Sequence, residues 1–419
     1  MINVIQHTLK IMKKKNLLFV GWLMWLLSAL FYALDYFQHT APSVLIEPIS
    51  HSLNLSIIYL GNVMSIYFPI YAISQIPAGM MLDKFGYRRV LSIACIIVSL
   101  GLLAIAMSTG MTQLVIGRSL IAVGSAFAFL GALKVASDWL TPKMFPIAVG
   151  LTNTIGVMGG MFGQAFLGEM IERYDWRTSL WMITIFGFVL AAFLFLTLRS
   201  KAPPLNDPAP LKLSTASFHI IKQPQLWLIA LYAGIMVGTV VNAFSELYDV
   251  IFLQYIYHLT TEQAAIMSTM IFVGIAVGGP THGIISNLFP QRKYWMLIGN
   301  ACTIIIFGLI VLVPKLIPID LLYVLYFLLG FFVSSMLLGF AVAKEMFPKS
   351  VHGITMAFIN MIIALCGAFF QPLLGELFEF LNGNLEKIQN PHTFNIGFLV
   401  LLIPLALSFI FCLKIKQTS

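Results

Sequence analysis

The chain has 419 residues, of which 59% are hydrophobic and only 10% are charged, and its formal net charge is +8 at pH 7. Soluble domains carry about 25% charged residues, so this composition excludes a water-soluble globular protein. The basic residues lie in short stretches between long apolar runs, which favours membrane topology and contact with lipid headgroups over nucleic-acid binding.

Apolar runs long enough to cross a bilayer follow one another along the chain, since about 20 helical residues span its hydrocarbon layer. Residues 1–16 are expected to form a cytoplasmic N-terminal segment. The run after Lys13-Lys14-Lys15 is too long for a signal peptide and is interpreted as an uncleaved first span. We predict an all-α integral membrane protein with twelve transmembrane helices, at 17–40, 56–82, 90–108, 112–138, 144–170, 178–198, 225–250, 262–287, 293–313, 319–343, 350–380 and 394–414.

One long polar stretch divides these spans into two sets of six. Residues 199–223 include Pro203, Pro204, Pro208 and Pro210, a composition typical of an extended linker. The predicted organisation is therefore a six-helix bundle over 17–198, a cytoplasmic interdomain linker over 199–223, a second bundle over 224–414 and a cytoplasmic tail over 415–419.

Lysine and arginine counts predict the orientation of the spans. With a cytoplasmic N-terminus, the inner segments hold seventeen basic residues, whereas the outer loops hold four, namely Arg173, Arg177, Lys315 and Lys387. This bias follows the positive-inside rule. Both termini are therefore expected in the cytoplasm.

The two halves carry the same pattern of residues at a nearly constant offset. The segment from Gly79 to Arg89 recurs 204 positions later from Gly283 to Lys293, with glycine, Asp/Asn, phenylalanine and two basic residues in the same places. Asn153 and Asn360 are 207 positions apart. Such repeats in a transporter are related by an axis along the membrane normal when corresponding spans run in the same direction.

These segments resemble signatures of the major facilitator superfamily. Gly79 to Arg89 is similar to its loop between spans two and three, although Tyr87 displaces the first basic residue by one position. Arg118 to Ala126 resembles its fourth-span signature. The stretch from Asp35 to Pro42 is loosely similar to nutrient-uptake, phagosomal-transporter-like members from intracellular bacterial pathogens. The resemblance implies two pseudo-symmetric six-helix bundles in a bacterial inner membrane, with no cofactor.

The resemblance also implies a cytoplasmic gate made of charged and small residues at the inner ends of the spans. Asp83, Arg88, Arg89 and Asp138 would hold the cytoplasmic side closed. The alternative is that these charges only determine topology. The full predicted set is Gly79, Asp83, Gly86, Arg88, Arg89, Asp138, Gly283, Asn287, Arg292, Lys293 and Glu345.

Ionisable side chains inside a bilayer are costly and usually functional. Asp35 in the first span and Arg118 in the fourth fall at matching depth, and we predict that they pair. Protonation of Asp35 would then free Arg118 for substrate; the alternative is a static buried ion pair. Glu246 and Asp249, near the outer end of the seventh span, are second candidates, although Glu246 could be a solvated charge at the rim.

Polar and aromatic residues near the middle of the spans are the expected substrate contacts. The alternative for each is hydrogen bonding between helices. No histidine pair has metal-ligand spacing, and the four cysteines are widely separated, so we expect neither a metal site nor a disulfide. The predicted cavity residues are Tyr32, Ser65, Tyr67, Tyr71, Asn153, Asn242, Ser334 and Asn360.

The favoured function is a monomeric secondary transporter that imports a small polar metabolite by proton symport and alternating access. An amino acid suits one cation and one anion in the cavity, while a nucleoside or another metabolite stays open. The chain contains no Walker phosphate loop and no catalytic constellation, which disfavours an ATPase or an enzyme. Export of a drug or siderophore by proton antiport is the main rival. The fifth-span run from Gly156 to Gly163 lacks the Gly-Pro step of drug antiporters.

Overall fold

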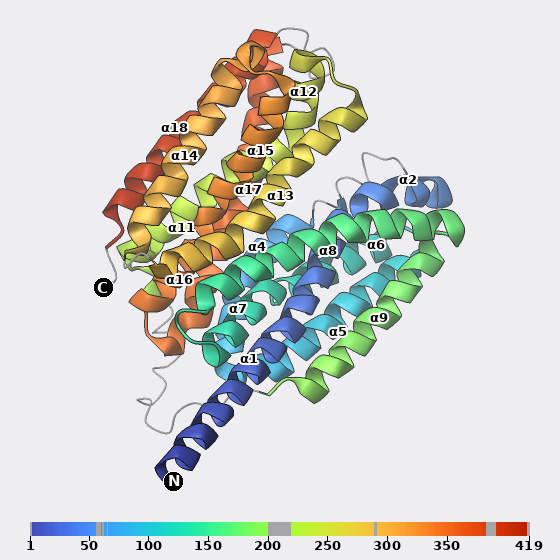
Figure 1. Cartoon of the computed structure of the whole chain (residues 1–419). Coiled ribbons are helices and arrows are strands. Elements are labelled where there is room, and N and C mark those ends of the chain that lie inside the picture. Colours follow the sequence, from blue (N-terminus) through green and yellow to red (C-terminus); the bar gives the residue numbers. More distant parts are fainter. Residues whose placement is uncertain are drawn as a thin grey trace. The chain divides into compact units, whose positions relative to one another are not determined.

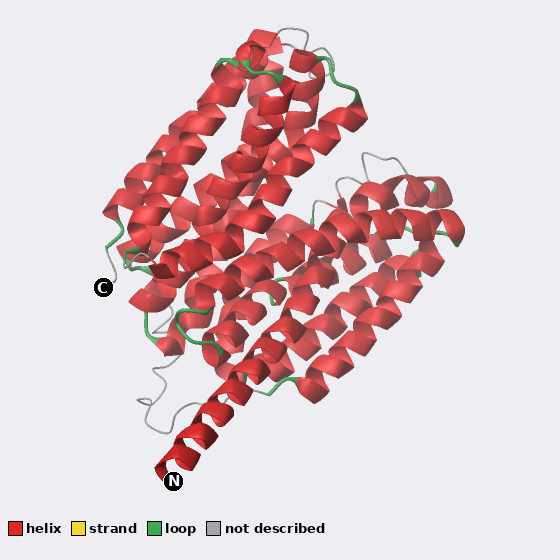
Figure 2. Ribbon diagram, in the orientation of Figure 1, coloured by secondary structure: helices red, strands yellow, loops and turns green. Residues whose placement is uncertain are grey.

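The computed structural model describes residues 2–55, 60, 63–64, 66–199, 219–288, 291–382 and 391–416. The regular elements of these residues are all helices, with no strand among them (Figure 2). The chain divides into two compact units. Unit 1 comprises Met1–Ala148 with Ile155–Leu213, and unit 2 comprises Val149–Thr154 with Ser214–Ser419.

The helices of unit 1 pack mainly around α5. This helix lies beside both α6 and α9, and α1 packs on α7 (Figure 1). Helix α8 contributes all but its 149–154 segment to this unit. The elements are α1 (Ile2–Thr40), α2 (Pro42–Leu53), α4 (Tyr67–Phe85), α5 (Tyr87–Ala106), α6 (Met111–Ser125), α7 (Ala128–Trp139), α8 (Phe145–Arg173) and α9 (Trp176–Thr197).

The contact between α5 and α6 depends on two facing glycines. A Cβ atom on Gly101 would lie 2.6 Å from the carbonyl oxygen of Gly117, and a Cβ on Gly117 would lie 2.7 Å from that of Gly101. Inside a bilayer there is no hydrophobic drive between helices, so close backbone packing at small residues supplies the attraction. These glycines therefore set the spacing of the two helices.

Unit 2 is built in the same way around α13 and α17. Helix α13 packs on α15, α17 packs on α11 and η1, and α14 packs on α18. The elements are α11 (Pro224–Met236), the π-helix η1 (Val237–Tyr248), α12 (Asp249–Tyr257), α13 (Thr261–Leu288), α14 (Arg292–Leu312), η2 (Pro314–Leu316), α15 (Ile319–Val333), η3 (Ser334–Leu337), α16 (Leu338–Met346), η4 (Lys349–Val351), α17 (His352–Asn382) and α18 (Pro391–Lys414).

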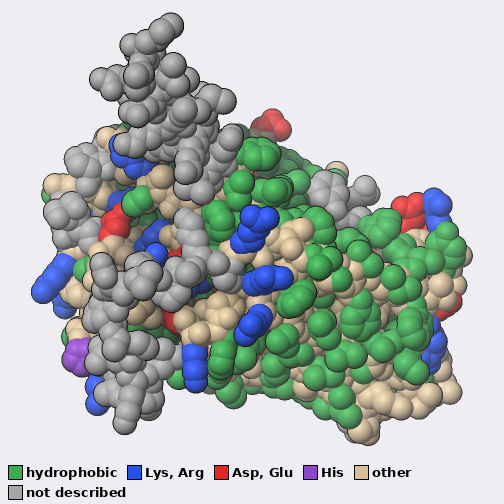
Figure 3. Space-filling view, turned by 90° about the horizontal axis from the view of Figure 1, so that it is seen from below, with side chains coloured by type: hydrophobic (Ala, Val, Ile, Leu, Met, Phe, Trp, Pro, Cys, Tyr) green, Lys and Arg blue, Asp and Glu red, His purple; other side chains and the backbone are tan. Residues whose placement is uncertain are grey.

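Eleven helices of the described residues are long and apolar enough to cross a membrane, and they match eleven of the twelve predicted spans. The remaining span, 56–82, includes residues outside the described ones, and its described part is α4. Side chains such as Ile73 and Leu196 are each 74% exposed, as lipid-facing residues would be. Figure 3 shows a wide hydrophobic surface with Lys and Arg side chains grouped at its border.

Three features were not predicted. Helix α2 lies between the first two predicted spans and is too short to be recognised as a span. The fourth and tenth spans are each interrupted, at Ala126–Phe127 between α6 and α7 and at Ser334–Leu337 between α15 and α16. The seventh span changes from α-helix to π-helix at Val237. Hydropathy cannot report the type of helix, because it averages the polarity of a window of residues and not the hydrogen-bond pattern that distinguishes the three types.

Candidate functional site

The two charged residues of unit 1 that we predict to couple proton and substrate binding are both buried. Asp35 lies in the second half of α1, and Arg118 lies in the middle of α6. Each is 3% exposed. Charged groups this deep in an apolar helix bundle require compensating polar contacts.

Tyr67 of α4 supplies the contact between them. Its hydroxyl donates a hydrogen bond to Asp35 Oδ1 at 3.3 Å, and its ring lies under the Arg118 guanidinium, 4.7 Å from ring centroid to Cζ. Neither charged residue belongs to the ion pairs Lys134–Asp83, Arg173–Glu169 and Arg292–Glu345. In this structure both side chains contact Tyr67, and the predicted direct pairing of Asp35 with Arg118 stays a prediction.

Arg118 is held by backbone carbonyls rather than by a carboxylate. Its Nε–H donates to the carbonyl of Met64 at 3.2 Å, and Nη1–H donates to that of Gln38 at 3.0 Å. These contacts use two of the five N–H donors of a guanidinium. Among the described residues, the Nη2 group has no hydrogen-bond partner, so it is able to take a carboxylate.

Aromatic rings from α1 and α4 surround this centre. Tyr67 and Tyr71 are stacked with ring centroids 5.4 Å apart, and His39 lies 5.6 Å from Tyr67. Tyr32 contacts Tyr36 of its own helix at 5.7 Å. Our sequence analysis missed His39 and Tyr36, although Tyr32 and Tyr36 are four residues apart and so share one helical face.

The polar residues predicted in unit 2 form a smaller cluster on η1. Asn242 Nδ2 donates to Glu246 Oε2 at 2.9 Å, and Gln371 Nε2 donates to the Asn242 carbonyl at 3.1 Å. Glu246 is exposed. Ser334 is buried, and its hydroxyl donates to the Phe331 carbonyl at 2.7 Å. This bond supports the local helix break rather than a ligand contact.

Asn153 of α8 and Asn360 of α17 are both half-buried. Ser65 lies outside the described residues. Assignment of the predicted cavity residues to one shared cavity stays a prediction.

One predicted gate residue of unit 1, Asp83, belongs to a buried ion pair. Lys134 Nζ lies 2.8 Å from Asp83 Oδ1, with side chains 11% and 4% exposed. Arg88 Nε donates to the Phe195 carbonyl at 2.7 Å. Gly86, with φ 76°, makes the turn between α4 and α5. Lys134 was not among the predicted gate residues, because a lysine near a helix end is expected to reach for the interface.

The corresponding end of unit 2 has a different ion pair. Arg292 Nη2 lies 2.8 Å from Glu345 Oε1, and Arg292 Nη1 donates to Ser286 Oγ at 3.0 Å. Lys293 Nζ donates to the Leu413 carbonyl at 2.7 Å. Gly283 and Asn287 lie in the last turns of α13.

His282 of α13 is a buried histidine that our sequence analysis did not single out. Its Nδ1 accepts a hydrogen bond from Trp295 Nε1 at 2.7 Å, and its Nε2 lies 2.7 Å from the Phe331 carbonyl. Trp can only donate and a carbonyl can only accept. The ring is therefore neutral with its proton on Nε2, and it joins α13, α14 and α15.

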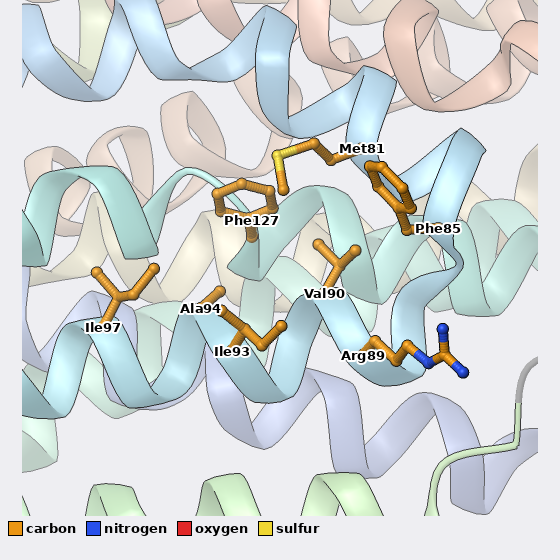
Figure 4. A pocket seen from close by; sticks show the side chains of 8 residues that line it. All are labelled: Met81, Phe85, Arg89, Val90, Ile93, Ala94, Ile97 and Phe127. Carbon is orange, nitrogen blue, oxygen red and sulfur yellow. The ribbon is translucent and has the colours of Figure 1, made fainter.

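A groove of about 280 Å³ lies along α4 and α5 in unit 1 (Figure 4). Arg89 is its one charged lining residue. Without further polar groups the groove cannot orient a polar solute, so we separate it from the Asp35–Tyr67–Arg118 centre. The apolar lining of the groove consists of Met81, Phe85, Val90, Ile93, Ala94, Ile97 and Phe127.

Within the described part of the chain, no group of three His, Cys, Asp or Glu residues could hold a metal ion.

Comparison with curated proteins finds bacterial transporters. The chain is 29% identical over 186 residues to the uncharacterized transporter YybO of Bacillus subtilis, covering 44% of this chain and 43% of the relative. It is 26% identical over 177 residues to the hexuronate transporter of B. subtilis, covering 42% of each. It is 28% identical over 174 residues to a probable L-galactonate transporter of Escherichia coli, covering 41% and 38%. The chain thus spans less than half the length of these relatives.

Solved structures share the fold over nearly the whole chain. FucP in the outward conformation matches with a TM-score of 0.67 at 18% identity, covering 93% of this chain and 99% of that one. The proton:xylose symporter XylE, bound to 6-bromo-6-deoxy-D-glucose, matches with a TM-score of 0.67 at 14% identity, covering 97% of each chain. The family model of the Major Facilitator Superfamily matches residues 24–255 and 247–418. The chain therefore belongs to the Major Facilitator Superfamily of membrane transporters.

Proposed function

We propose that this protein is a secondary active transporter that imports a small carboxylate-bearing metabolite together with a proton. The observation that carries the proposal is the Asp35–Tyr67–Arg118 arrangement. A titratable carboxyl and a cation with unused donors both contact one tyrosine inside unit 1. The names of two relatives, a hexuronate transporter and a probable L-galactonate transporter, support a carboxylate as the transported group.

The proposed coupling follows from charge balance in a medium of low dielectric constant. While Asp35 is ionised, its negative charge compensates Arg118 across the Tyr67 ring. A proton on Asp35 removes that compensation and leaves the Arg118 cation uncompensated, which is costly in a buried site. A substrate carboxylate on Arg118 Nη2 restores neutrality. Proton and substrate therefore favour each other's binding, which is the requirement for symport.

Two substrate classes fit this centre. A sugar acid matches the transported compounds named for the relatives. An amino acid, which our sequence analysis favoured, would use the opposite charges of Arg118 and Asp35. The two differ in what Asp35 does, because an amino acid's ammonium group needs Asp35 ionised, whereas a sugar acid binds best with Asp35 protonated.

Within this proposal the protein is a monomer in a bacterial inner membrane, with both termini in the cytoplasm. Alternating access of the two halves would move the substrate across. The ion pairs Lys134–Asp83 and Arg292–Glu345 lie at the ends of the units that are expected on the cytoplasmic side, and they would stabilise that side when it is closed.

The test uses purified full-length protein in proteoliposomes, with hexuronates, aldonates and amino acids as a substrate panel and internal pH as the signal. A transported sugar acid should acidify the lumen with the wild type. Asp35→Asn should abolish acidification but keep exchange of labelled substrate across the membrane. Asp320→Asn is a matched control, because Asp320 is exposed at the start of α15. Equal acidification by Asp35→Asn would overturn proton coupling at this residue.

Arg118→Lys separates charge from geometry at the same centre. Lysine keeps the charge but has no planar fork for the Gln38 and Met64 carbonyls and a substrate carboxylate. We expect at least about a tenfold loss of transport, since each 1.4 kcal/mol of lost substrate or transition-state binding is a factor of ten. Transport equal to the wild type would argue that Arg118 only holds the helices together.

A further inference from the structure

Unit 2 contains a buried carboxyl group that the proposed transport cycle does not use. Asp249 is the first residue of α12, directly after the π-helix η1, and it is 1% exposed. Glu246, one turn earlier, is exposed and accepts a hydrogen bond from Asn242. The two neighbouring acids therefore differ in solvent exposure and in hydrogen bonding.

Several polar atoms around Asp249 are buried without a hydrogen-bond partner among the described residues. These atoms are both carboxyl oxygens of Asp249, the hydroxyl of Ser245 and the hydroxyl of Tyr326. Ser245 is 4% exposed and Tyr326 is 0% exposed. Native proteins leave few buried polar groups unpaired, so these four atoms from η1, α12 and α15 need hydrogen-bond donors as well as acceptors among themselves.

The other groups that face the Asp249 carboxyl are neutral or apolar. The Ser268 hydroxyl of α13 and the backbone N–H groups of Val250 and Asp249 are hydrogen-bond donors close to it. The same Ser268 hydroxyl donates to the Ser245 carbonyl at 3.5 Å. Tyr326 of α15 interacts with it electrostatically, as Tyr257 of α12 does with Tyr326. The ring of Phe244 lies 6.0 Å from that of Tyr326.

None of the ion pairs in the described part of the chain includes Asp249. No described lysine or arginine contributes to the electrostatics of its carboxyl group. An ionised Asp249 would therefore be a buried negative charge without a cation to compensate it.

We propose that Asp249 binds a proton and is a carboxylic acid at neutral pH, forming a second proton site in addition to Asp35. An isolated carboxylate in such a site is far less stable than the neutral acid. A carboxylic acid can donate one hydrogen bond and accept others, so it can pair with the Ser245 and Tyr326 hydroxyls that are otherwise unpartnered. Each repeat then has one buried titratable carboxyl near its first span. This inference does not depend on Asp35 being the coupling residue.

Infrared difference spectroscopy of the full-length protein in lipid nanodiscs tests the proposal directly. A buried carboxylic acid has a carbonyl stretch that is separate from those of carboxylates and amides. The wild type should show this band for Asp249 at neutral pH, and Asp249→Asn should lose it. Glu246→Gln is the matched control and should keep the band, because Glu246 is exposed one turn away. Asp35→Asn should also keep the Asp249 band, whatever its effect on transport.

Tyr326→Phe gives an independent reading if Asp249→Asn proves unstable. Removing the tyrosine hydroxyl takes away one hydrogen-bond partner, so the Asp249 band should remain but shift to higher frequency. An acid band that persists at full intensity in Asp249→Asn would overturn the proposal. A wild-type band that sodium chloride removes, while choline chloride does not, would also overturn it by showing that the carboxylate holds a metal cation.

Discussion

The same sequence pattern joins the second span of each repeat to the third, from Gly79 to Arg89 and from Gly283 to Lys293. The two units use the charged residues of this pattern differently. In unit 1 the acid before the loop, Asp83, pairs with Lys134 of α7. In unit 2 the position of Asp83 is occupied by Asn287, 204 residues later. There the base after the loop, Arg292, pairs with Glu345 of α16. The repeat thus keeps the basic residues after the loop in the same places, while the acid before it and these ion pairs differ between the units.

The two pairs also differ in burial. Both side chains of the unit 1 pair are at most 11% exposed, whereas Glu345 is 32% exposed. Removal of one partner from a buried pair leaves an uncompensated charge, but solvent screens the survivor of an exposed pair. The comparison therefore predicts unequal effects of equivalent mutations.

The largest effect is expected for Lys134→Ala. This change leaves the Asp83 carboxylate buried without its ion-pair partner and should destabilise the protein by about 3–5 kcal/mol. Thermal unfolding of the purified protein in detergent measures it. The exposed neighbour Lys84 offers the control, since Lys84→Ala should have little effect. The double exchange of Asp83→Lys with Lys134→Asp should recover part of the loss, and failure to recover any would argue against the pair as the cause.

A smaller effect is expected for Arg292→Ala, the matched change in unit 2. Solvent reaches Glu345, so the ion pair itself is worth about 1 kcal/mol or less. Loss of the hydrogen bond to Ser286 adds about 1 kcal/mol. The same unfolding assay should place this variant clearly between wild type and Lys134→Ala. If both variants unfold at the same temperature, burial is not what distinguishes the two units.

The smallest effect on stability is expected at the start of the sixth span of each repeat, which is α9 in unit 1 and α18 in unit 2. In unit 1, Asp175 caps α9 by accepting hydrogen bonds from the backbone N–H groups of Arg177 and Thr178, whereas α18 of unit 2 begins at Pro391. Asp175→Ala should cost about 1 kcal/mol.

The side-chain hydrogen bond from Thr178, followed by its backbone N–H, lowers the pKa of Asp175. A lowered folded-state pKa means that the stabilisation is present above the unfolded value of about 3.9. It is lost as the pH falls through the lowered pKa. Unfolding should therefore differ between wild type and Asp175→Ala at pH 7, and this difference should shrink as the pH falls below about 4. A difference independent of pH would contradict capping by the carboxylate.

The spans themselves could be predicted closely from sequence. The predicted segments 90–108, 178–198 and 293–313 correspond to Tyr87–Ala106, Trp176–Thr197 and Arg292–Leu312. Each is a continuous apolar run between polar residues, so hydropathy determines its limits. The breaks at Ala126–Phe127 and Ser334–Leu337 lie within such runs and leave no hydropathy signal.

The site was harder to predict, for a geometric reason. Position along a span gives depth, and depth predicted that Asp35 and Arg118 lie near each other, as their shared contact with Tyr67 bears out. It gives no rotation about the helix axis, so it could not show that Tyr67 lies between them or that Arg118 binds the Gln38 carbonyl. Likewise, Lys134 lies in the buried ion pair with Asp83, a contact that position along the span did not indicate.

The facing glycines of α5 and α6 have a genetic consequence. Every missense codon at Gly101 or Gly117 encodes a side chain with a Cβ atom, which would lie 2.6 to 2.7 Å from a carbonyl oxygen of the neighbouring helix. Saturation mutagenesis should therefore find these two codons intolerant to all substitutions, alanine included. Lipid-facing positions such as Ile73 should accept most apolar residues. Such a map of tolerance would trace the α5–α6 contact through the membrane without any assay of substrate.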